Sequence, residues 1–591
     1  MIIRKFVGSK NGSGGLFMDR PLRDSYNTKK KILMLVRALV LLNVVVIIFI
    51  VIRIFHNAGD VSMYVVAGSE GHFYGEISVY PHSDEESGNL YFFLPGKKDS
   101  SDYRLYIEKA KEIKIGNKSY HAGDKLDKDI ITYEGEGKKR LLENGSSYTL
   151  TKKNGDVSEG KIFFMCGGDV ETMYISTSKD YMEKVDEDPL HKTRTSATFE
   201  IYDSGNVKES AGDLKISGHG NSTWTELMEE FPDREFKRSY NISFDSAKEI
   251  LGMRAAENFV LLSNFYDESE AKNYIVLDTA RKLGMENVPD CKYANLYING
   301  EYRGLYLVAQ KIKKGNGFLD LSSDGYLAKF DYEERVKADE NAFTQVNNNF
   351  AEIVYPKKPS SKELEDITTD LTSIEDAISS GEFMDLVDEE SFVKYYLIQE
   401  FFENGDADRA SQYVYKADID DKLIAGPVWD FDLTMGHPWF SYDGAEINAL
   451  WIKGLVDEKG WLRHLSNDDA FMGKICRYYR DYFSDVIENE MDATFPLVMY
   501  KIENSFYMDM IRYERGPEYY DKFDYAKYGY DRFDSLGIIG ETKNWVMARK
   551  NFWDGYVKNP DEYEEFITEP GKGTKSIRSL IVMKNKRENI K

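Results

Sequence analysis

Residues 403–436 carry the pattern that most restricts how this chain can fold, because acidic side chains recur there at the ends of short elements. Asp406 follows the end of an expected helix, in a tight loop opened by an Asn-Gly pair. Two short strands are expected over 412–425, and a Trp-Asp-Phe-Asp sequence with Asp430 and Asp432 comes next. If that segment is extended, these two side chains share one face. With the third carboxylate, they could hold a divalent cation through oxygen ligands.

The order of these elements is also that of a protein-kinase catalytic centre. There a helix leads to a loop Asp that positions the acceptor hydroxyl, a hairpin follows, and a later Asp holds Mg²⁺ on the phosphates. In that pattern a second metal ligand, an Asn, stands five residues after the loop Asp. Five residues after Asp406 the chain has Ser411, a weaker ligand. A capped or solvated acidic loop is the alternative interpretation of the same residues.

An apolar run over residues 32–55, interrupted by two arginines and an asparagine, predicts a transmembrane helix. Residues 1–31 carry eight Lys and Arg, whereas residues 56–85 carry none. This asymmetry predicts a single-pass signal anchor with its N-terminus in the cytoplasm and everything after residue 56 outside the cell. A cleaved signal peptide is the alternative, but a 31-residue leader is long for one.

Charge and cysteine content exclude several classes of protein. The chain has 101 Asp and Glu against 77 Lys and Arg, and its net charge of −24 repels phosphate backbones, so no nucleic-acid partner is expected. Three widely separated cysteines form no CxxC pair, which argues against a disulfide scaffold and a cysteine-based zinc site. A chain of 591 residues is too long for one hydrophobic core, so two or more folded units are expected.

Changes in residue pattern divide the chain into five expected regions. A cytoplasmic basic tail (1–31) and the signal anchor (32–55) come first. Short strands broken by turns predict a small β-rich extracellular module over 56–168. Mixed strands and amphipathic helices predict the main domain over 169–560, and residues 561–591 form a polar, basic tail. The expected fold class is a mixture of α+β and α/β, with a transmembrane helix, a small all-β module and a main domain that ends in helices.

One helix and one hairpin of the main domain have clear signals. Asp267 followed by Glu270 predicts a capping box, for a helix that runs to Lys282 and stops at Gly284. An Asn-Gly pair between two apolar runs predicts a hairpin over 293–310.

Seven ordered motifs between residues 170 and 440 resemble those of the CotH kinase family, bacterial spore-coat and surface proteins with an atypical kinase fold. The two most specific read Leu-Tyr-Ile-Asn-Gly-Glu-Tyr-Arg-Gly-Leu-Tyr (296–306) and Gly-Pro-Val-Trp-Asp-Phe-Asp-Leu-Thr-Met-Gly (426–436). The others lie at 216–224 (with His219 where Arg is usual), 236–240, 251–253, 259–267 and 391–400. The resemblance implies an atypical kinase-like main domain.

The resemblance assigns nucleotide binding to two positions. Lys237 takes the phosphate-contacting role, with adjacent Arg238 as a competitor; the alternative is a solvated lysine at a strand edge. Asn221 lies in a Gly-Asn-Ser-Thr turn whose backbone N–H groups could approach phosphates. A purely structural turn is the alternative there.

The resemblance also assigns the catalytic and metal roles. Asp406 takes the base-like role, with Asp408 as second choice, and Asp430, Asp432 and Ser411 are the metal ligands. The implied cofactors are ATP and Mg²⁺ or Mn²⁺, and the implied partner is a surface or coat protein that is phosphorylated on Ser or Thr.

Besides His219, three residues depart from the family pattern. Gln310 stands where the family's Glu is expected and cannot form a Lys–Glu ion pair, Ser411 replaces the Asn ligand, and Lys329 stands where an acid is frequent. Two functions of different class therefore stay open: a metal-dependent Ser/Thr kinase, and a catalytically impaired scaffold that binds cell-wall or coat partners. A different metal-dependent transferase that uses the same acids is a third.

Overall fold

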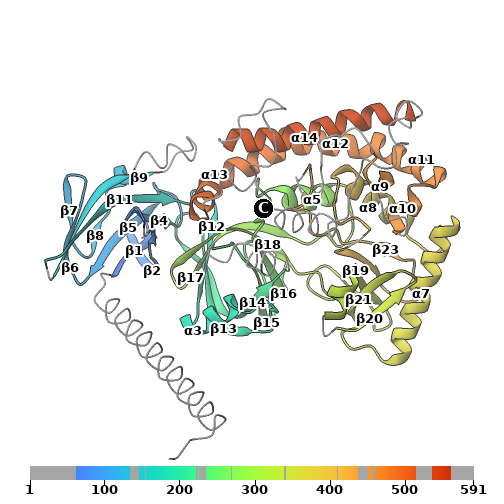
Figure 1. Ribbon diagram of the computed structural model, residues 1–591, viewed down its shortest axis with the longest axis horizontal. Coiled ribbons are helices and arrows are strands. Elements are labelled where there is room, and N and C mark those ends of the chain that lie inside the picture. The colour runs from blue at the N-terminus through green and yellow to red at the C-terminus, as the bar shows by residue number, and fades with distance from the viewer. Residues whose placement is uncertain are drawn as a thin grey trace, which may run out of the picture.

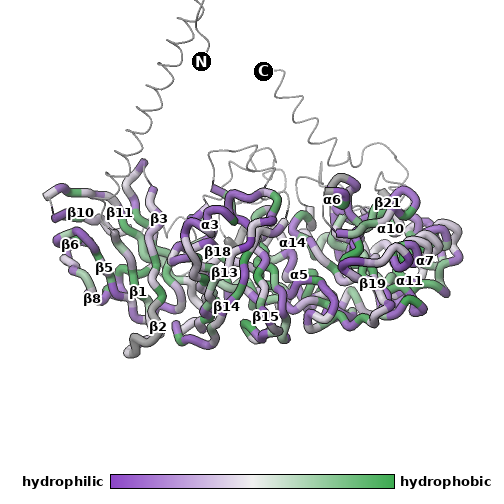
Figure 2. The backbone as a smooth tube through the Cα atoms, turned by 90° about the horizontal axis from the view of Figure 1, so that it is seen from below, coloured by the Kyte–Doolittle hydropathy of each residue, from purple (hydrophilic) through white to green (hydrophobic). Residues whose placement is uncertain are grey.

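The computed structural model describes residues 62–84, 86–132, 145–153, 155–220, 224, 235–267, 269–338, 341–408, 410–436, 450–454, 460–513 and 535–560. The expected basic tail, the segment 32–55, Asn221 and the tail 561–591 lie outside these residues. Figure 1 shows a β-rich module, a barrel and a mixed sheet with helices following one another along the long axis. Hydrophobic and hydrophilic stretches are mixed in each of the three parts (Figure 2).

The first part of the described chain consists of two sheets, ordered β2-β1-β5-β8 and β3-β4-β11-β10-β6-β7, with β9 paired to β11. Their strands are β1 (Ser62–Ser69), β2 (His72–Val79), β3 (His82–Ser83), β4 (Leu90–Leu94), β5 (Ser101–Glu108), β6 (Ala110–Ile115), β7 (Lys118–Tyr120), β8 (Asp124–Lys125), β9 (Ile131–Thr132), β10 (Ser146–Lys152) and β11 (Val157–Cys166). The sheets touch the barrel through Tyr297, whose hydroxyl donates to the Phe93 carbonyl at 2.9 Å.

The second part is a closed barrel in the order β12-β13-β14-β15-β16-β18-β17. Its strands are β12 (Glu171–Ser176), β13 (Arg194–Tyr202), β14 (Lys208–His219), β15 (Ser239–Lys248), β16 (Ala256–Leu262), β17 (Cys291–Ile298) and β18 (Glu301–Gln310), and helix α3 (Lys179–Asp186) follows β12. The parallel pairing of β12 with β17 closes the ring. The predicted hairpin is confirmed as β17–β18, and its Asn299-Gly300 turn has φ of 52° and 86°, the left-handed values that these residues tolerate.

The third part is a sheet in the order β20-β21-β19-β22-β23, covered by helices. Its strands are β19 (Tyr326–Asp331), β20 (Phe343–Val346), β21 (Asn349–Tyr355), β22 (Gln412–Lys416) and β23 (Ile424–Ala425). The remaining helices of the main domain follow β16 in the chain: α5 (Lys272–Lys282), α6 (Glu333–Ala338), α7 (Ser361–Ser380), α8 (Glu389–Phe401), α9 (Trp451–Gly454), α10 (Trp461–Leu465), α11 (Asp469–Tyr478), α12 (Ser484–Asn489), α13 (Phe495–Arg512) and α14 (Ser535–Tyr556). Two π-helical turns, η3 (Tyr479–Phe483) and η4 (Glu490–Thr494), join α11, α12 and α13.

Helix α8 is the centre of the helical layer, since every residue from Phe392 to Phe401 is buried. Its buried Glu400 forms an ion pair of 2.7 Å with Arg549 of α14 and accepts hydrogen bonds from the first N–H groups of α9. Because a buried charge is stable only when it is paired, this cluster fixes α8 and the loop that follows it.

The predicted fold class is wrong in two respects. No helix in the described ranges is long and apolar enough to cross a membrane, and the apolar run 32–55 lies outside those ranges. The 20-residue helix α7 carries charged side chains and buries Ile367, Leu371, Ile374 and Ile378 against the domain. In addition, the strands of the main domain close into a barrel, because a parallel contact between two strands far apart in sequence leaves no local pattern. The expected orientation of residues 1–31 stays a prediction.

Candidate active site

Lys237 lies just before β15, and its side chain is completely buried. Its Nζ is 3.0 Å from Oε1 of Glu270 and 2.8 Å from Oδ1 of Asp509, and it lies 5.1 Å from the ring centroid of Tyr306. An ammonium group is stable away from water only with such partners. Lys237 is therefore not a solvated residue at a strand edge.

Glu270 is held in an unusual position by the turn that leads into α5. Its φ is 58°, in the left-handed region that a Glu seldom occupies. Asp267 accepts a hydrogen bond of 2.7 Å from the N–H of Lys272, the first residue of α5, but the N-cap position is Ala271, which makes no side-chain cap hydrogen bond. The predicted capping box is wrong, because the helix begins only after Ala271 and the Glu270 side chain binds Lys237. The helix ends at Lys282 as predicted, and Gly284 follows it with φ of 66°.

Gln310 has a different role from the one that the family pattern predicted for its position. Its Nε2 donates to the carbonyls of Arg254 and Asn316, both at 3.2 Å, and its Oε1 accepts from the N–H of Asp290 at 2.9 Å. These bonds brace the end of β18. The site has a Lys–Glu ion pair although Gln310 is neutral, because Glu270 provides the carboxylate that pairs with Lys237.

A chain of buried hydrogen bonds leads from Glu270 to the Asp430–Asp432 loop. The Glu270 carbonyl accepts from Nδ2 of Asn264 at 3.1 Å, and Oδ1 of Asn264 accepts from Nδ2 of Asn273 at 3.0 Å. Oδ1 of Asn273 in turn accepts from the backbone N–H of Phe431 at 2.8 Å. Motifs more than a hundred residues apart in sequence are thereby joined in one network.

Asp430 and Asp432 lie in a loop and not in an extended segment. Asp430 has φ of 69°, so the predicted alternation of side chains along a strand is wrong here. The hydroxyl of Ser411 donates to Oδ2 of Asp430 at 2.8 Å. Burial raises the pKa of both carboxyls, and for Asp432 the charges of Asp430, Asp267 and Asp406 raise it further. The site therefore brings together four acidic side chains from three segments of the chain, close enough for their charges to interact.

The contacts of Asp406 and Asp408 distinguish these two candidates for the base-like role. Asp408 accepts hydrogen bonds of 2.7 and 2.6 Å from the N–H groups of Leu462 and Arg463, in the first turn of α10. It is thus engaged in holding a helix. Asp406 lies half-buried in the loop after α8, near enough for its charge to act on Asp432. Of the two, Asp406 is the residue that faces the acidic loop.

Two basic side chains from outside the predicted set lie beside the acids. Lys329 contacts Glu352 at 2.8 Å and Asp331 at 3.3 Å, and Arg335 of α6 is 3.5 Å from Asp331. Burial opposes the charge of Arg335, but the charges of Asp331, Asp406 and Asp430 prevail and raise its pKa. Sequence analysis noted Lys329 only as a departure and missed Arg335, which no motif contains.

The carboxylate oxygens of the predicted acids and the hydroxyl oxygen of Ser411 are the type of ligand that a hard divalent cation prefers. Carboxylates with raised pKa values repel one another, and a cation that binds oxygen would relieve this repulsion. Within the described residues, however, no three His, Cys, Asp or Glu side chains stand in an arrangement ready to hold a metal. The residues that would hold the ion are Asp406, Asp430 and Asp432, with the hydroxyl of Ser411 beside Asp430.

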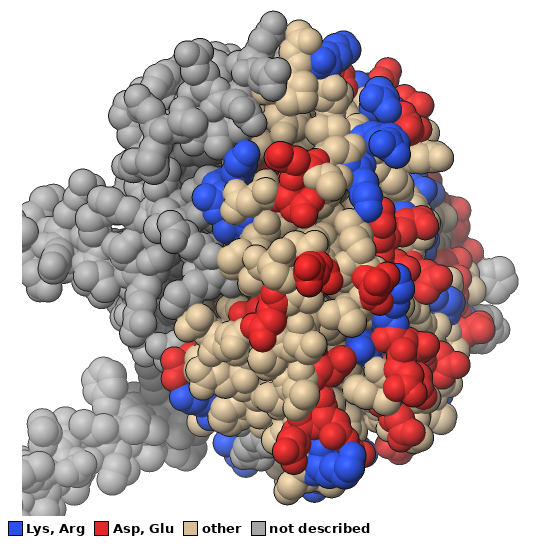
Figure 3. Space-filling view, turned by 90° about the vertical axis from the view of Figure 1, so that its right-hand side faces the viewer, with Lys and Arg blue, Asp and Glu red and all other residues tan. Residues whose placement is uncertain are grey.

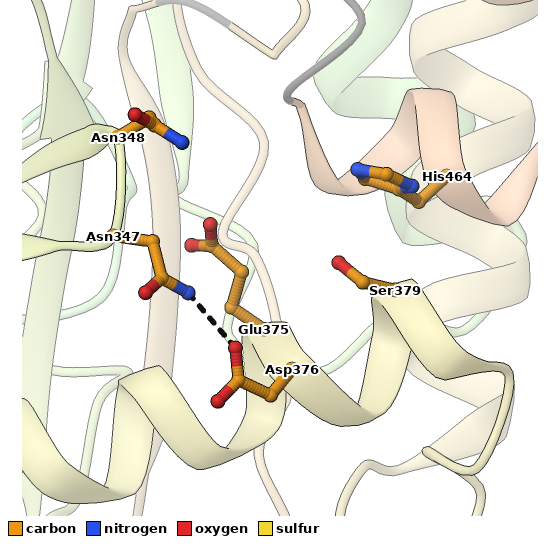
Figure 4. A pocket seen from close by; sticks show the side chains of 6 residues that line it. All are labelled: Asn347, Asn348, Glu375, Asp376, Ser379 and His464. Atoms are coloured by element: carbon orange, nitrogen blue, oxygen red, sulfur yellow. Dashed lines mark hydrogen bonds between the residues drawn. The ribbon is translucent and has the colours of Figure 1, made fainter.

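A polar pocket of about 370 Å³ lies elsewhere, between α7, α10 and the β20–β21 turn (Figure 4). Its lining residues are Asn347, Asn348, Glu375, Asp376, Ser379 and His464. Glu375 is already bonded to Nε1 of Trp461 at 2.9 Å and to Nδ2 of Asn349 at 3.2 Å. None of the predicted site residues lines this pocket. On the face shown in Figure 3, acidic side chains predominate in the lower half of the coloured surface, and several basic ones gather at its upper right.

A buried Lys–Glu pair on a barrel, joined to a helix–loop–hairpin–Asp unit, resembles the arrangement of parts in a protein-kinase centre. Residues 216–505 match the family model described as CotH kinase protein, which supports placing this domain in the CotH kinase family. All seven motifs lie within the matched residues. Comparison with curated proteins found no match.

Proposed function

We propose that this domain is an atypical protein kinase of the CotH type, which transfers the γ-phosphoryl group of ATP to a Ser or Thr hydroxyl of a surface or coat protein. The observation that carries the proposal is the buried Lys237–Glu270 pair and its hydrogen-bonded connection to the Asp430–Asp432 loop. A buried ion pair costs desolvation energy, so its presence beside a half-buried acidic loop favours a functional role over a structural one.

Each residue has a distinct task in this proposal. Lys237 binds phosphate oxygens, and Glu270 keeps its ammonium in place. Asp406 accepts the proton of the acceptor hydroxyl as its oxygen forms a bond to the γ-phosphorus and the bond to the ADP leaving group breaks. Asp430 and Asp432 would hold Mg²⁺ or Mn²⁺, which neutralises charge on the phosphates when it is bound. Phe431, through its N–H bond to Asn273, fixes these two acids.

Radiolabel transfer from ATP, to the protein itself and to a generic Ser/Thr-rich acceptor, tests the proposal in the full-length chain. Lys237→Met is expected to abolish transfer. Lys394→Met is the matched control, since Lys394 is also a buried lysine, with its ion pair to Glu390 on α8. It should lower stability yet keep transfer per folded molecule. Equal transfer in wild type and Lys237→Met would contradict the proposal.

A second candidate, a non-catalytic scaffold, is favoured by one observation. Arg335 and Lys329 already supply positive charge beside Asp331 and Asp430, so the described acids have partial compensation without a metal. The scaffold predicts that neither Mg²⁺ nor Mn²⁺ with ATP raises the melting temperature of the protein.

A further inference from the structure

Helix α13 brings a second carboxylate to Lys237. Asp509 of this helix is fully buried, and its Oδ1 lies 2.8 Å from Nζ of Lys237. The same oxygen accepts a hydrogen bond of 2.9 Å from the N–H of Leu305 in β18. One ammonium is thus shared between Glu270, which precedes α5, and Asp509, which lies beyond the residues matched by the family model.

Gly304 of β18 makes this contact sterically possible. A side chain there would overlap Oδ1 of Asp509, and its Cβ would lie 2.9 Å from Cε of Lys237. The φ of Gly304 is 113°, a conformation that residues with a side chain rarely adopt. Gly304 also belongs to the 296–306 motif, to which the kinase assignment gave no role. Two separate features, a close approach and a motif glycine, therefore converge on the Lys237–Asp509 pair.

Contacts on both sides of Asp509 fix α13 against the barrel. One turn earlier, Ser505 accepts from Nδ2 of Asn295 at 2.8 Å and donates to the Gly167 carbonyl at 2.7 Å. After Asp509, the guanidinium of Arg512 donates two hydrogen bonds of 2.9 and 2.6 Å to Glu235. Asp509 therefore cannot drift with a loose helix, and it presents its carboxylate from a set direction. Figure 1 shows α13 lying across the barrel near β12.

We propose that Asp509 is a positioning residue for Lys237, so that α13 belongs to the phosphate-binding unit; this inference rests on the proposed kinase function. Lysine has a flexible stem, and Glu270 alone would let its ammonium swing around one contact. A second carboxylate from another direction fixes the place of this fully buried ammonium. Misplacement of such a group by about 1 Å can cost about 100-fold in rate.

Steady-state kinetics of ATP-dependent transfer by the full-length protein test this role. Asp509→Asn is expected to lower kcat/KM for ATP by about 10- to 100-fold. Asn316→Ala is the matched control, because it removes buried side-chain hydrogen bonds to the backbone of Glu257 and Asn258, away from α13 and Lys237. It should lower the melting temperature yet keep kcat/KM within about 2-fold of wild type. Asp509→Glu, which keeps the charge but shifts it by one methylene, should lower kcat/KM with a smaller change in melting temperature.

A double-mutant cycle separates a positioning role from a structural one. If Asp509 acts only through Lys237, Asp509→Asn should add almost no loss of kcat/KM to Lys237→Arg. Additive losses, or an Asp509→Asn protein that behaves like Asn316→Ala, would overturn the inference and leave the kinase function standing. Absence of transfer and of ATP binding in the wild-type protein would instead overturn the proposed function, and this inference with it.

Discussion

Oδ1 of Asn273 accepts a hydrogen bond of 2.8 Å from the backbone N–H of Phe431, across 158 residues of sequence. Asn273 is in the first turn of α5, next to the segment that carries Glu270, and Phe431 stands between the two candidate metal ligands. Together with the hydrogen bond of 2.8 Å from Nζ of Lys272 to the Thr434 carbonyl, this bond sets the place of the Asp430–Asp432 loop relative to the Lys237–Glu270 pair. Two neighbouring side chains at the start of α5 therefore join the phosphate-binding and metal-binding halves of the proposed site.

Asn273→Ala should impair both stability and function. It removes the acceptor of the Phe431 N–H and the donor to Oδ1 of Asn264, which costs about 1–3 kcal/mol in the free energy of unfolding. ATP-dependent transfer per folded molecule should fall as well, because the loop loses one of its anchors. Urea unfolding and initial rates measure the two effects. Asn316→Ala, which removes a buried amide from the brace beside Gln310, should destabilise the protein without that loss of transfer.

The two neighbouring acids of the loop after α8 should respond in opposite ways. Asp408→Asn weakens the hold on the first turn of α10 and should lower the free energy of unfolding by about 1–2 kcal/mol, with transfer retained. Asp406→Asn should change stability by less than about 1 kcal/mol and abolish transfer. Chemical denaturation alongside an activity assay decides this. Retained transfer in the Asp406 variant would move the base-like role elsewhere.

Sequence alone was sufficient for the features of the fold that depend on neighbouring residues. The Asn299-Gly300 turn, the end of α5 at Lys282 and the loop that carries Asp406 all have local signals in turn and cap residues. The closed barrel has none, since β12 meets β17 across more than a hundred residues.

The candidate site was harder to predict, because its electrostatic contacts are long-range. Lys237 was assigned from a motif, but its partners Glu270 and Asp509 lie in other segments and no spacing marks them. Glu270 was even expected in a helix cap, because its distance from Asp267 fits one. The left-handed φ of Asp430 likewise has no signal in the sequence and defeats the alternation expected for a strand.

Ser411→Asn tests whether the departure from the kinase pattern weakens the metal site. Ser411 has φ of 54°, a value that Asn tolerates better than most residues, so the free energy of unfolding should change by less than about 1 kcal/mol. The amide oxygen is a better ligand than the hydroxyl, and the Mg²⁺- or Mn²⁺-dependent rise in melting temperature should increase. An unchanged metal response in a folded variant would argue that position 411 is not a ligand.

Glu490 of η4 should make the stability of the domain depend on pH. It pairs with Lys282 at the end of α5, yet burial raises its pKa to about 7. Protonated Glu490 therefore stabilises the fold fully below its ordinary pKa of 4.5, and this contribution is lost as pH rises through 7. Glu490→Gln should flatten the pH profile of the melting temperature. Between pH 4.5 and pH 8 its free energy of unfolding should rise by up to about 3 kcal/mol relative to that of wild type.

The control for this pH effect lies in the same π-helical turn. Asp492, half-exposed and paired with Lys543, lies on the surface, so Asp492→Asn should keep the wild-type pH profile. If wild type and Glu490→Gln show the same profile, Glu490 is ionised across the range and the burial argument fails.

Thermal melting of the full-length protein, with and without ATP and Mg²⁺ or Mn²⁺, tests the central claim most directly when it is done on wild type and Asp432→Asn. Because burial and neighbouring acids raise the pKa of Asp432, its charge destabilises the metal-free fold near neutral pH. The account predicts that Asp432→Asn melts at the same or a higher temperature without metal, by no more than about 1–2 kcal/mol. It also predicts that wild type alone is stabilised by the metal and ATP together. A wild-type protein that shows no response at millimolar metal and ATP would contradict the kinase assignment.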